Sequence, residues 1–137
     1  MLLVTHAPVI AIVDDDPSVR RALHRLVQAA GYTAQSFASA HEFLHSLPGC
    51  RAACLVLDIH LDGMSGFELQ QRLAADGVGI PVIFVTAHDD APTRERIEGS
   101  GAVGHLWKPV DEQQLLGAIR RAIGSDQGGI DRPDDVN

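Results

Sequence analysis

The sequence predicts a single α/β domain in which one five-stranded parallel sheet is covered by helices on both faces. Five short, largely apolar segments alternate along the chain with segments that carry helix start signals. Three of these apolar segments are continuous runs without a polar face, which is typical of strands buried on both sides of a parallel sheet. Such alternation implies right-handed crossovers within one sheet.

The five expected strands differ in polarity. The second is the most polar and is expected at an edge of the sheet, whereas the first, third and fourth are apolar throughout. In chain order the strands are Val9–Val13, Tyr32–Phe37, Leu55–Leu57, Val82–Val85 and Ala102–Trp107.

The helices between these strands are predicted from capping residues. Each pair below places at the start of an amphipathic segment a side chain that can accept a hydrogen bond from a backbone N–H group. In one pair this side chain precedes a proline, which has no N–H group that would need a partner. The pairs are Asp16–Pro17, Ser39–Glu42, Ser65–Glu68 and Asp111–Gln114. A further helix over Asp90–Ser100 has Ile97 as almost its only large apolar residue, so it should bury little and be among the less stable parts of the fold.

Length and charge limit the function classes. The 137 residues suit one domain, which we place at residues 9–124, between a short extension (1–8) and a polar tail (125–137) expected to be disordered. The net charge is −7 with no basic run, so direct nucleic-acid binding is not expected. The sequence has no signal peptide pattern and no apolar run long enough for a bilayer, which predicts a cytoplasmic protein without a membrane partner.

Two cysteines, Cys50 and Cys54, could form half of a zinc site or a redox pair. No second pair follows, and the spacing is not Cys-x-x-Cys. We therefore interpret them as incidental thiols, one in a loop and one entering a strand.

The residues at the strand ends suggest a functional site. Ligand sites of parallel sheets form at the carboxyl ends of strands. The first strand ends in Asp14-Asp15, the third in Asp58, the fourth in Thr86 and the fifth in Lys108. These side chains converge only if the first and third strands are neighbours, which favours the flavodoxin-like order 2-1-3-4-5 over 3-2-1-4-5.

Taken singly, each of these residues has an ordinary structural explanation as a cap, a turn residue or a surface charge. Together, the clustered carboxylates would repel one another and favour a divalent cation, and oxygen-only ligands indicate Mg²⁺. A carboxylate beside Mg²⁺ can attack phosphorus and form an acyl phosphate. The hydroxyl of Thr86 and the ammonium of Lys108 are suitable partners for the phosphoryl oxygens.

Over about Val9–Gly124 the sequence resembles the receiver domain of two-component response regulators. The resemblance implies that Asp58 is the phosphoacceptor and that Thr86 and Lys108 hold the phosphoryl oxygens. It also implies Mg²⁺ bound directly by Asp15 and Asp58, through water by Asp14, and by the backbone carbonyl of His60. The matching motifs are Asp14-Asp15, Leu57-Asp58-x-x-Leu61-x-Gly63-Met64-Ser65-Gly66, Thr86-Ala87 and Lys108-Pro109.

In this family the phosphoryl group comes from a phosphohistidine on a sensor histidine kinase or a histidine phosphotransfer protein. The resemblance therefore implies a phosphorylation-controlled signalling module rather than an enzyme with its own substrate. Two positions depart from the family pattern: Asp62 stands where proline is frequent, and His105 where tyrosine or phenylalanine is usual. A stand-alone receiver and a piece of a longer regulator are both compatible with the sequence.

Two other functions stay open. A small phosphatase could use Asp58 as its nucleophile. Such an enzyme would need a second acid just after Asp58 and a capping domain to select the substrate. Two residues after Asp58 the chain has His60 instead of an acid. A pseudo-receiver that binds a partner without phosphorylation fits less well with the intact acids, Thr86 and Lys108. A dinucleotide site is poorly supported because acids replace the glycine-rich turn after the first strand.

Two surfaces are expected around this site. His60 and His88 lie two residues beyond Asp58 and Thr86, so their side chains should flank its mouth. His105 and Trp107 should project together from the last strand, since residues two apart in a strand share a face. The face formed by the Asp90–Ser100 helix, the last strand and the final helix is the predicted surface for an unidentified downstream protein or for a phosphorylation-dependent homodimer.

Overall fold

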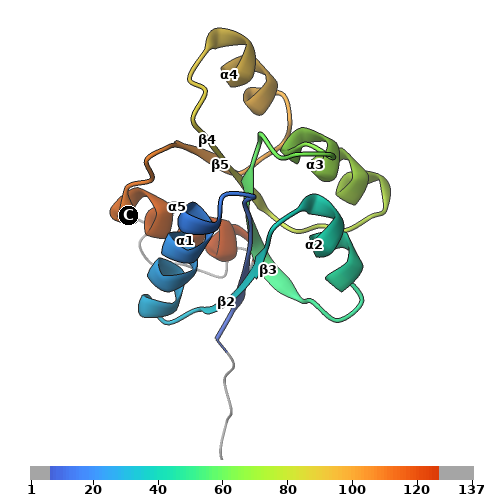
Figure 1. Cartoon of the computed structure of the whole chain (residues 1–137). Coiled ribbons are helices and arrows are strands. Elements are labelled where there is room, and N and C mark those ends of the chain that lie inside the picture. The colour runs from blue at the N-terminus through green and yellow to red at the C-terminus, as the bar shows by residue number, and fades with distance from the viewer. Residues whose placement is uncertain (1–6, 127–137) are drawn as a thin grey trace, which may run out of the picture.

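The computed structural model describes residues 7–126, which form five strands alternating with five helices (Figure 1). The strands are β1 (Val9–Val13), β2 (Thr33–Phe37), β3 (Ala52–Asp58), β4 (Val82–Thr86) and β5 (Gly104–Trp107). The helices are α1 (Pro17–Ala29), α2 (Ala40–Ser46), α3 (Gly66–Ala75), α4 (Ala91–Glu98) and α5 (Glu112–Asp126). In the described part of the chain, none of these helices has the length and apolar character needed to span a bilayer.

The sheet has the strand order β2-β1-β3-β4-β5, and every pairing is parallel. This confirms the predicted fold class and strand order. The polar strand β2 lies at one edge, as expected, and β5 lies at the other. Because β1 and β3 are neighbours, their carboxyl ends meet at the centre of one edge of the sheet.

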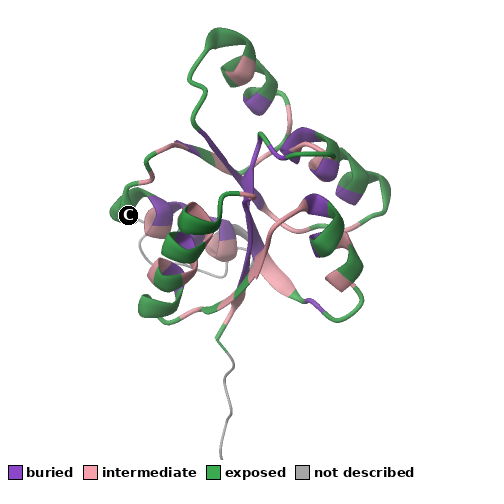
Figure 2. Cartoon of the chain, in the orientation of Figure 1, coloured by how far each residue is buried: buried purple, intermediate pink, exposed green. Residues whose placement is uncertain are grey.

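Two apolar cores cover the two faces of the sheet. One packs α1 and α5 against strand residues such as Ile12 and Val56. The other packs α2, α3 and α4 against the alternate residues of the same strands, such as Val13 and Leu57. Figure 2 shows the strands buried at the centre and the outer faces of the helices exposed. Burial on both faces explains why β1, β3 and β4 are largely apolar.

The predicted caps hold three of these helices as expected. Asp16 accepts hydrogen bonds from the N–H groups of Ser18 and Val19, with Pro17 in the first position of α1. Ser65 and Glu68 make both hydrogen bonds of a capping box at α3, and Asp111 accepts from the N–H of Gln114 at 2.9 Å. At α2, Ser39 accepts from the N–H of Glu42, but the Glu42 carboxylate reaches one residue further back and accepts from the N–H of Ala38.

The boundaries of some elements differ from the predicted ones. β3 begins at Ala52, three residues before the apolar run that predicted it, and β5 begins at Gly104 rather than Ala102. α5 continues to Asp126, past Gly124, since one glycine costs a helix only about 1 kcal/mol. Residues 125 and 126, which we expected in the tail, therefore belong to α5. Residues 127–137 of the proposed tail, and residues 1–6 of the proposed N-terminal extension, lie outside the described residues.

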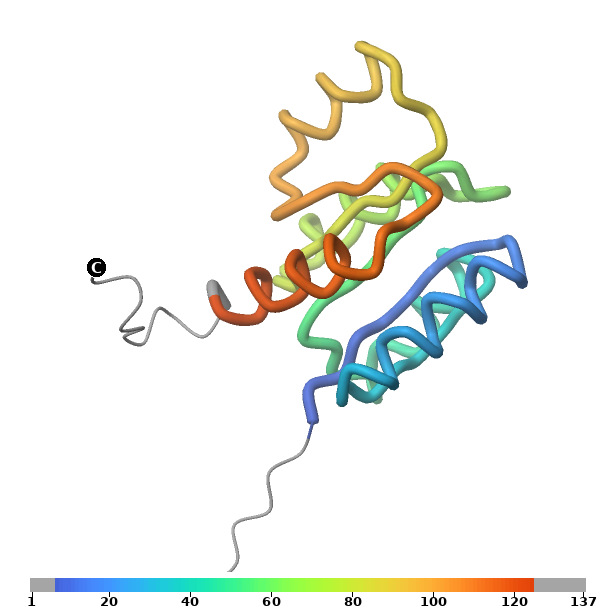
Figure 3. Tube along the Cα trace, turned by 90° about the vertical axis from the view of Figure 1, so that its left-hand side faces the viewer, coloured from blue at the N-terminus to red at the C-terminus, as the bar shows by residue number. Residues whose placement is uncertain are grey.

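Helix α4 packs more loosely than its neighbours. Its buried residue is Ile97, as the sequence suggested. In Figures 1 and 3, α4 stands apart from the other helices at the β4–β5 side of the sheet. Few apolar contacts hold this helix, so its position is cheaper to change than that of α1 or α5.

Candidate functional site

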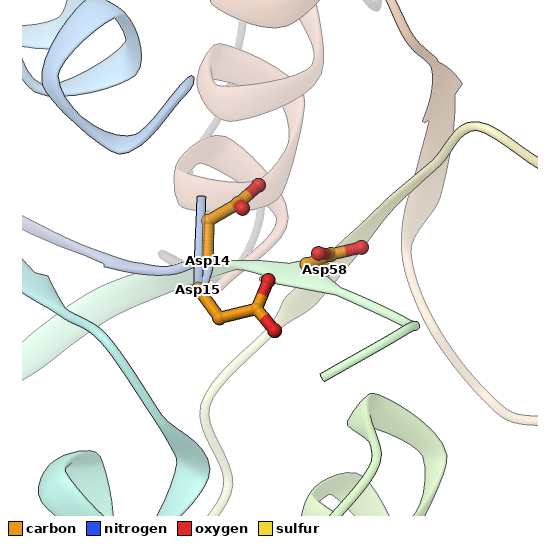
Figure 4. A group of neighbouring side chains, drawn as sticks. All are labelled: Asp14, Asp15 and Asp58. Carbon is orange, nitrogen blue, oxygen red and sulfur yellow. The ribbon is translucent and has the colours of Figure 1, made fainter. Parts of the chain in front are cut away.

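Three carboxylates meet where β1 and β3 end. Asp14 and Asp15 directly follow β1, and Asp58 is the last residue of β3. One oxygen from each of the three side chains lies within 4.8 Å of the others (Figure 4). Asp14 and Asp58 are buried, whereas Asp15 is partly exposed. The structure thus brings together the acids that the sequence placed at neighbouring strand ends.

Backbone N–H groups hold each of the three carboxylates in place. Asp14 Oδ1 accepts from the N–H of Asp16 at 3.0 Å, and Asp58 Oδ1 accepts from the N–H of His60 at 3.2 Å. Asp15 Oδ2 accepts from the N–H of Asp62 at 3.3 Å, across the gap between the two loops. These bonds orient the carboxylates before any ligand arrives.

Lys108 connects the end of β5 to these acids. Its Nζ lies 3.0 Å from Asp14 Oδ2 and 3.4 Å from Asp58 Oδ2. The Lys108 N–H donates to the carbonyl of Thr86 at 2.8 Å, which continues the pairing of β5 with β4 by one residue. Burial lowers the pKa of Lys108, but the neighbouring carboxylates outweigh it and raise the pKa overall. Lys108 is therefore a fixed cation at this site.

Thr86 is the last residue of β4 and lies at the same edge of the sheet as the three acids and Lys108. The residue is buried, and its Oγ1 accepts a hydrogen bond from the N–H of His88 at 3.0 Å. His60 Nδ1 lies 3.4 Å from Thr86 Oγ1, and the rings of His60 and His88 stack with centroids 3.9 Å apart. This confirms the prediction that the two histidines flank the mouth of the site.

Gly66 allows the first turn of α3 to approach the end of β3. Its N–H donates to the carbonyl of Ile59 at 2.9 Å. A Cβ atom at this position would lie 2.4 Å from the carbonyl oxygen of Asp58 and 2.8 Å from the Cα of Ile59. Backbone atoms cannot move aside as a flexible side chain can, so the site geometry requires glycine here.

The pKa of the Asp58 carboxyl group is raised in the folded protein. Burial raises its pKa, the neighbouring Asp14 raises it further, and Lys108 partly offsets both, giving a pKa of about 6 against an ordinary value of 3.8. The pKa of His60 is lowered, first by burial and then by His88. The acids thus carry more negative charge than one lysine balances.

A divalent cation fits this surplus of negative charge. Among the described residues, Asp14, Asp15 and Asp58 are the three acids whose carboxylate oxygens lie close enough together to hold one metal ion. The buried Asp14 Oδ2 accepts no well-aligned hydrogen bond from the described residues, although Lys108 Nζ is its ion-pair partner. Oxygen donors suit a hard cation such as Mg²⁺ better than a thiophilic metal. The predicted fourth ligand, the carbonyl of His60, stays a prediction.

Sequence reasoning missed the role of Arg20, a residue of α1. Its Nη1 donates to the carbonyl of Asp14 at 2.8 Å and so fixes the turn after β1. The spacing of six residues from Asp14 carries no local signal for this contact. Cys50 and Cys54 are free and belong to the cores on opposite faces of the sheet, so they do not form a common site.

Known proteins are similar to this chain in fold and in sequence. The family model described as response regulator receiver domain matches residues 10–120. Response regulator protein TmoT of Ectopseudomonas mendocina is 42% identical over 115 residues, which cover 84% of this chain and 52% of TmoT. The chain thus spans about half the length of this relative.

Two solved structures extend the comparison. The response regulator StyR matches with a TM-score of 0.79 at 43% identity, over 88% of this chain and 61% of that one. The structure named FixJ-N matches with a TM-score of 0.79 at 33% identity, over 87% of this chain and 95% of that one. Residues 10–120, which the family model matches, contain the strand ends that carry the clustered acids, Thr86 and Lys108. This chain belongs to the family of response regulator receiver domains.

Proposed function

We propose that this chain is a phosphorylation-controlled signalling module in which Asp58 accepts a phosphoryl group from a phosphohistidine. The donor would be a sensor histidine kinase or a histidine phosphotransfer protein. The observation that carries the proposal is the position of the Asp58 carboxylate, at a strand end, between Lys108 and the carboxylates of Asp14 and Asp15. The family of the chain supports the same function.

In the proposed reaction, a carboxylate oxygen of Asp58 bonds to phosphorus while the phosphorus–nitrogen bond of the donor breaks and its electron pair returns to the imidazole. Asp15 and Asp58 would hold Mg²⁺ directly, and Asp14 through water. When bound, the cation neutralises charge on the phosphoryl oxygens and the acids. Lys108 Nζ and Thr86 Oγ1 would each take one phosphoryl oxygen, and water would later hydrolyse the acyl phosphate.

This reading is preferred to a phosphatase acting on small esters. Such an enzyme would need an acid shortly after Asp58 to protonate the leaving group. The side chain two residues on is the imidazole of His60, which stacks on His88. A pseudo-receiver would not need Asp58, Thr86 and Lys108 around one space. Turnover of para-nitrophenyl phosphate by the purified chain would favour the phosphatase instead.

Incubation with acetyl phosphate tests the phosphoacceptor. We expect one phosphoryl group per chain by mass spectrometry, only when Mg²⁺ is present, and none on Asp58→Asn. Asp15→Asn should lose most of its affinity for Mg²⁺, and so label poorly at the same Mg²⁺ concentration, because it removes a charged ligand. Asp76→Asn, which changes an exposed aspartate of α3's C-terminus, is the matched control and should label like wild type. Full labelling of Asp58→Asn would disprove the assignment.

We also propose that phosphorylation acts on the face formed by α4, β5 and α5. Thr86 is paired with Trp107 in the β4–β5 register, so a change at the site reaches the neighbouring strand directly. Trp107 is half-buried, and the guanidinium of Arg94 from α4 lies 5.5 Å from the centre of its ring. The His105 ring packs edge-on against the same indole, with the two ring centroids 5.2 Å apart. The loosely packed α4 could thus shift at low cost, exposing or covering a surface for self-association or a downstream protein.

Light scattering and fluorescence test this output surface. With beryllofluoride, which mimics the phosphoryl group, we expect a change in the fluorescence of Trp107, the single tryptophan of the chain, and an increase in mass if the chain self-associates. Trp107→Glu should abolish the mass increase, whereas His41→Glu, on the exposed face of α2, should not. If neither signal responds to the mimic and Trp107→Glu merely destabilises the fold, the surface is wrongly assigned.

A further inference from the structure

Two exposed histidines from neighbouring loops form a pair that the phosphorylation chemistry does not require. His60 follows β3 and His88 follows β4, and both are exposed. Their ring centroids are 3.9 Å apart, and the ring planes are tilted by 37°. Since β3 and β4 are adjacent strands, the sheet itself holds the two loops side by side.

The nitrogens of these rings are accessible to a ligand. His60 Nδ1 lies 3.4 Å from Thr86 Oγ1, which leaves its Nε2 without a hydrogen-bond partner among the described residues. The hydrogen bond that His88 makes with Thr86 uses its backbone N–H, and within residues 7–126 the His88 ring nitrogens have no hydrogen-bond partner. Asp90 adds a carboxylate beside the pair: hydrogen bonds from Thr93 chiefly lower the pKa of Asp90, and His88 and His60 lower it further.

We propose that His60 and His88 together bind a divalent transition-metal ion that prefers imidazole nitrogen, such as Zn²⁺, with the Asp90 carboxylate as a nearby compensating charge. Two nitrogens on one tetrahedral ion at about 2.1 Å are about 3.4 Å apart. Coordination to one ion sets the two ring centroids about 5 Å apart, because each centroid then lies about 3.2 Å from the metal. The rings, now 3.9 Å apart, therefore have to rotate away from each other, which two exposed side chains can do.

This site is chemically distinct from the acid cluster. The carboxylates of Asp14, Asp15 and Asp58 offer oxygen and suit a hard cation, whereas the pair offers nitrogen and suits ions later in the first transition row. An ion on the pair would tie the loop after β3 to the loop after β4. The inference does not depend on phosphorylation of Asp58.

A second histidine pair has to be separated from this one. His41 and His45 are both exposed on α2, one turn apart, and residues at this spacing lie on the same helix face. Such a pair can also bind transition metals, so the experiment uses the full chain with His41→Ala and His45→Ala as the background. In this background we titrate Co²⁺, which is paramagnetic and broadens the imidazole signals of its ligands in NMR spectra.

With excess Mg²⁺ present to occupy the acid cluster, we expect one Co²⁺ to bind in the background variant and to broaden the signals of His60 and His88 together. Adding His60→Ala or His88→Ala should weaken Co²⁺ binding at least about tenfold, since changing even a group behind a ligand has that effect. Adding His24→Ala, on α1, is the matched control and should change nothing. Excess Mg²⁺ should not displace the Co²⁺, because Mg²⁺ prefers oxygen ligands.

Three results would overturn the proposal. The first is loss of Co²⁺ binding when the α2 pair alone is removed. The second is displacement of Co²⁺ by Mg²⁺, which would place the ion on the acid cluster. The third is unchanged Co²⁺ affinity in both His60→Ala and His88→Ala. Because both side chains are exposed, these variants are expected to fold, and urea unfolding verifies that they do.

Discussion

Gly66→Ala is expected to lower the free energy of unfolding by about 2–4 kcal/mol, more than most single substitutions. The new Cβ would lie 2.4 Å from the carbonyl oxygen of Asp58 and 2.8 Å from the Cα of Ile59. Relief requires the first turn of α3 to move away from the end of β3. That movement also shifts Asp58 and breaks the hydrogen bond from the Gly66 N–H to the Ile59 carbonyl.

Urea unfolding of the metal-free chain measures this loss. Gly79→Ala is the matched control, because nothing lies within 4 Å of the Cβ that it would add and its φ is not positive. We expect the control to be as stable as wild type or slightly more so, since alanine restricts the unfolded chain. Equal urea midpoints for Gly66→Ala and Gly79→Ala would contradict the close approach of α3 to β3.

Asp58→Asn is expected to stabilise the metal-free protein at pH 7.5 by about 1–2 kcal/mol. The pKa of Asp58 is about 6 in the fold against an ordinary value of 3.8. That difference corresponds to at most about 3 kcal/mol, which solvent around the site reduces. The cause is the cost of keeping an ionised carboxylate buried beside Asp14, and a neutral amide avoids this cost.

The sign of the pH dependence follows from the raised pKa. A carboxyl whose pKa is higher in the fold than in the unfolded chain favours folding while it is protonated. This contribution is fully present below pH 3.8 and is lost as the pH rises through about 6. The advantage of Asp58→Asn over wild type should therefore shrink as the pH falls from 7 to 4, and thermal unfolding across this range measures it.

Adding Mg²⁺ should reverse the order of the two proteins. A cation that binds the folded state alone stabilises it, by about 2.7 kcal/mol at one hundred times its Kd. Wild type should gain from Mg²⁺, whereas Asp58→Asn lacks one charged ligand and should gain much less. Asp76→Asn is again the control: it breaks an exposed ion pair with Arg72, which is worth less than about 1 kcal/mol, and should respond to Mg²⁺ like wild type. Equal stability of Asp58→Asn and wild type at every pH would refute the buried-charge explanation.

Much of the fold could be predicted from local patterns. The buried run before Asp58 and the capping box of Ser65 and Glu68 are short-range features, and both occur in the structure where the sequence placed them. Strand starts were less predictable: β3 begins at Ala52 because Ala52 pairs with Val9 on β1, a long-range contact that no local apolar run indicates.

For the candidate site too, the sequence predicted some features and not others. The order of motifs placed Asp14, Asp15, Asp58, Thr86 and Lys108 at one edge of the sheet, since parallel strands end together. The sequence could not give the contact of Arg20 with the Asp14 carbonyl or of Arg94 with Trp107. The Arg20 contact runs back along the chain and the Arg94 contact runs forward, and each joins a helix side chain to a residue outside that helix, so neither has a periodic signal.

By itself, the sequence determined the parallel α/β fold and the acids at the strand ends, because apolar periodicity, caps and turns act over a few residues. The strand order was predicted from the condition that the strand-end side chains converge on one site. The tertiary structure decided the distances. It placed Lys108 Nζ between Asp14 and Asp58, stacked His60 on His88 and left α4 held mainly through Ile97. These features depend on how two or more elements pack across the sheet, and that packing is a property of the whole chain.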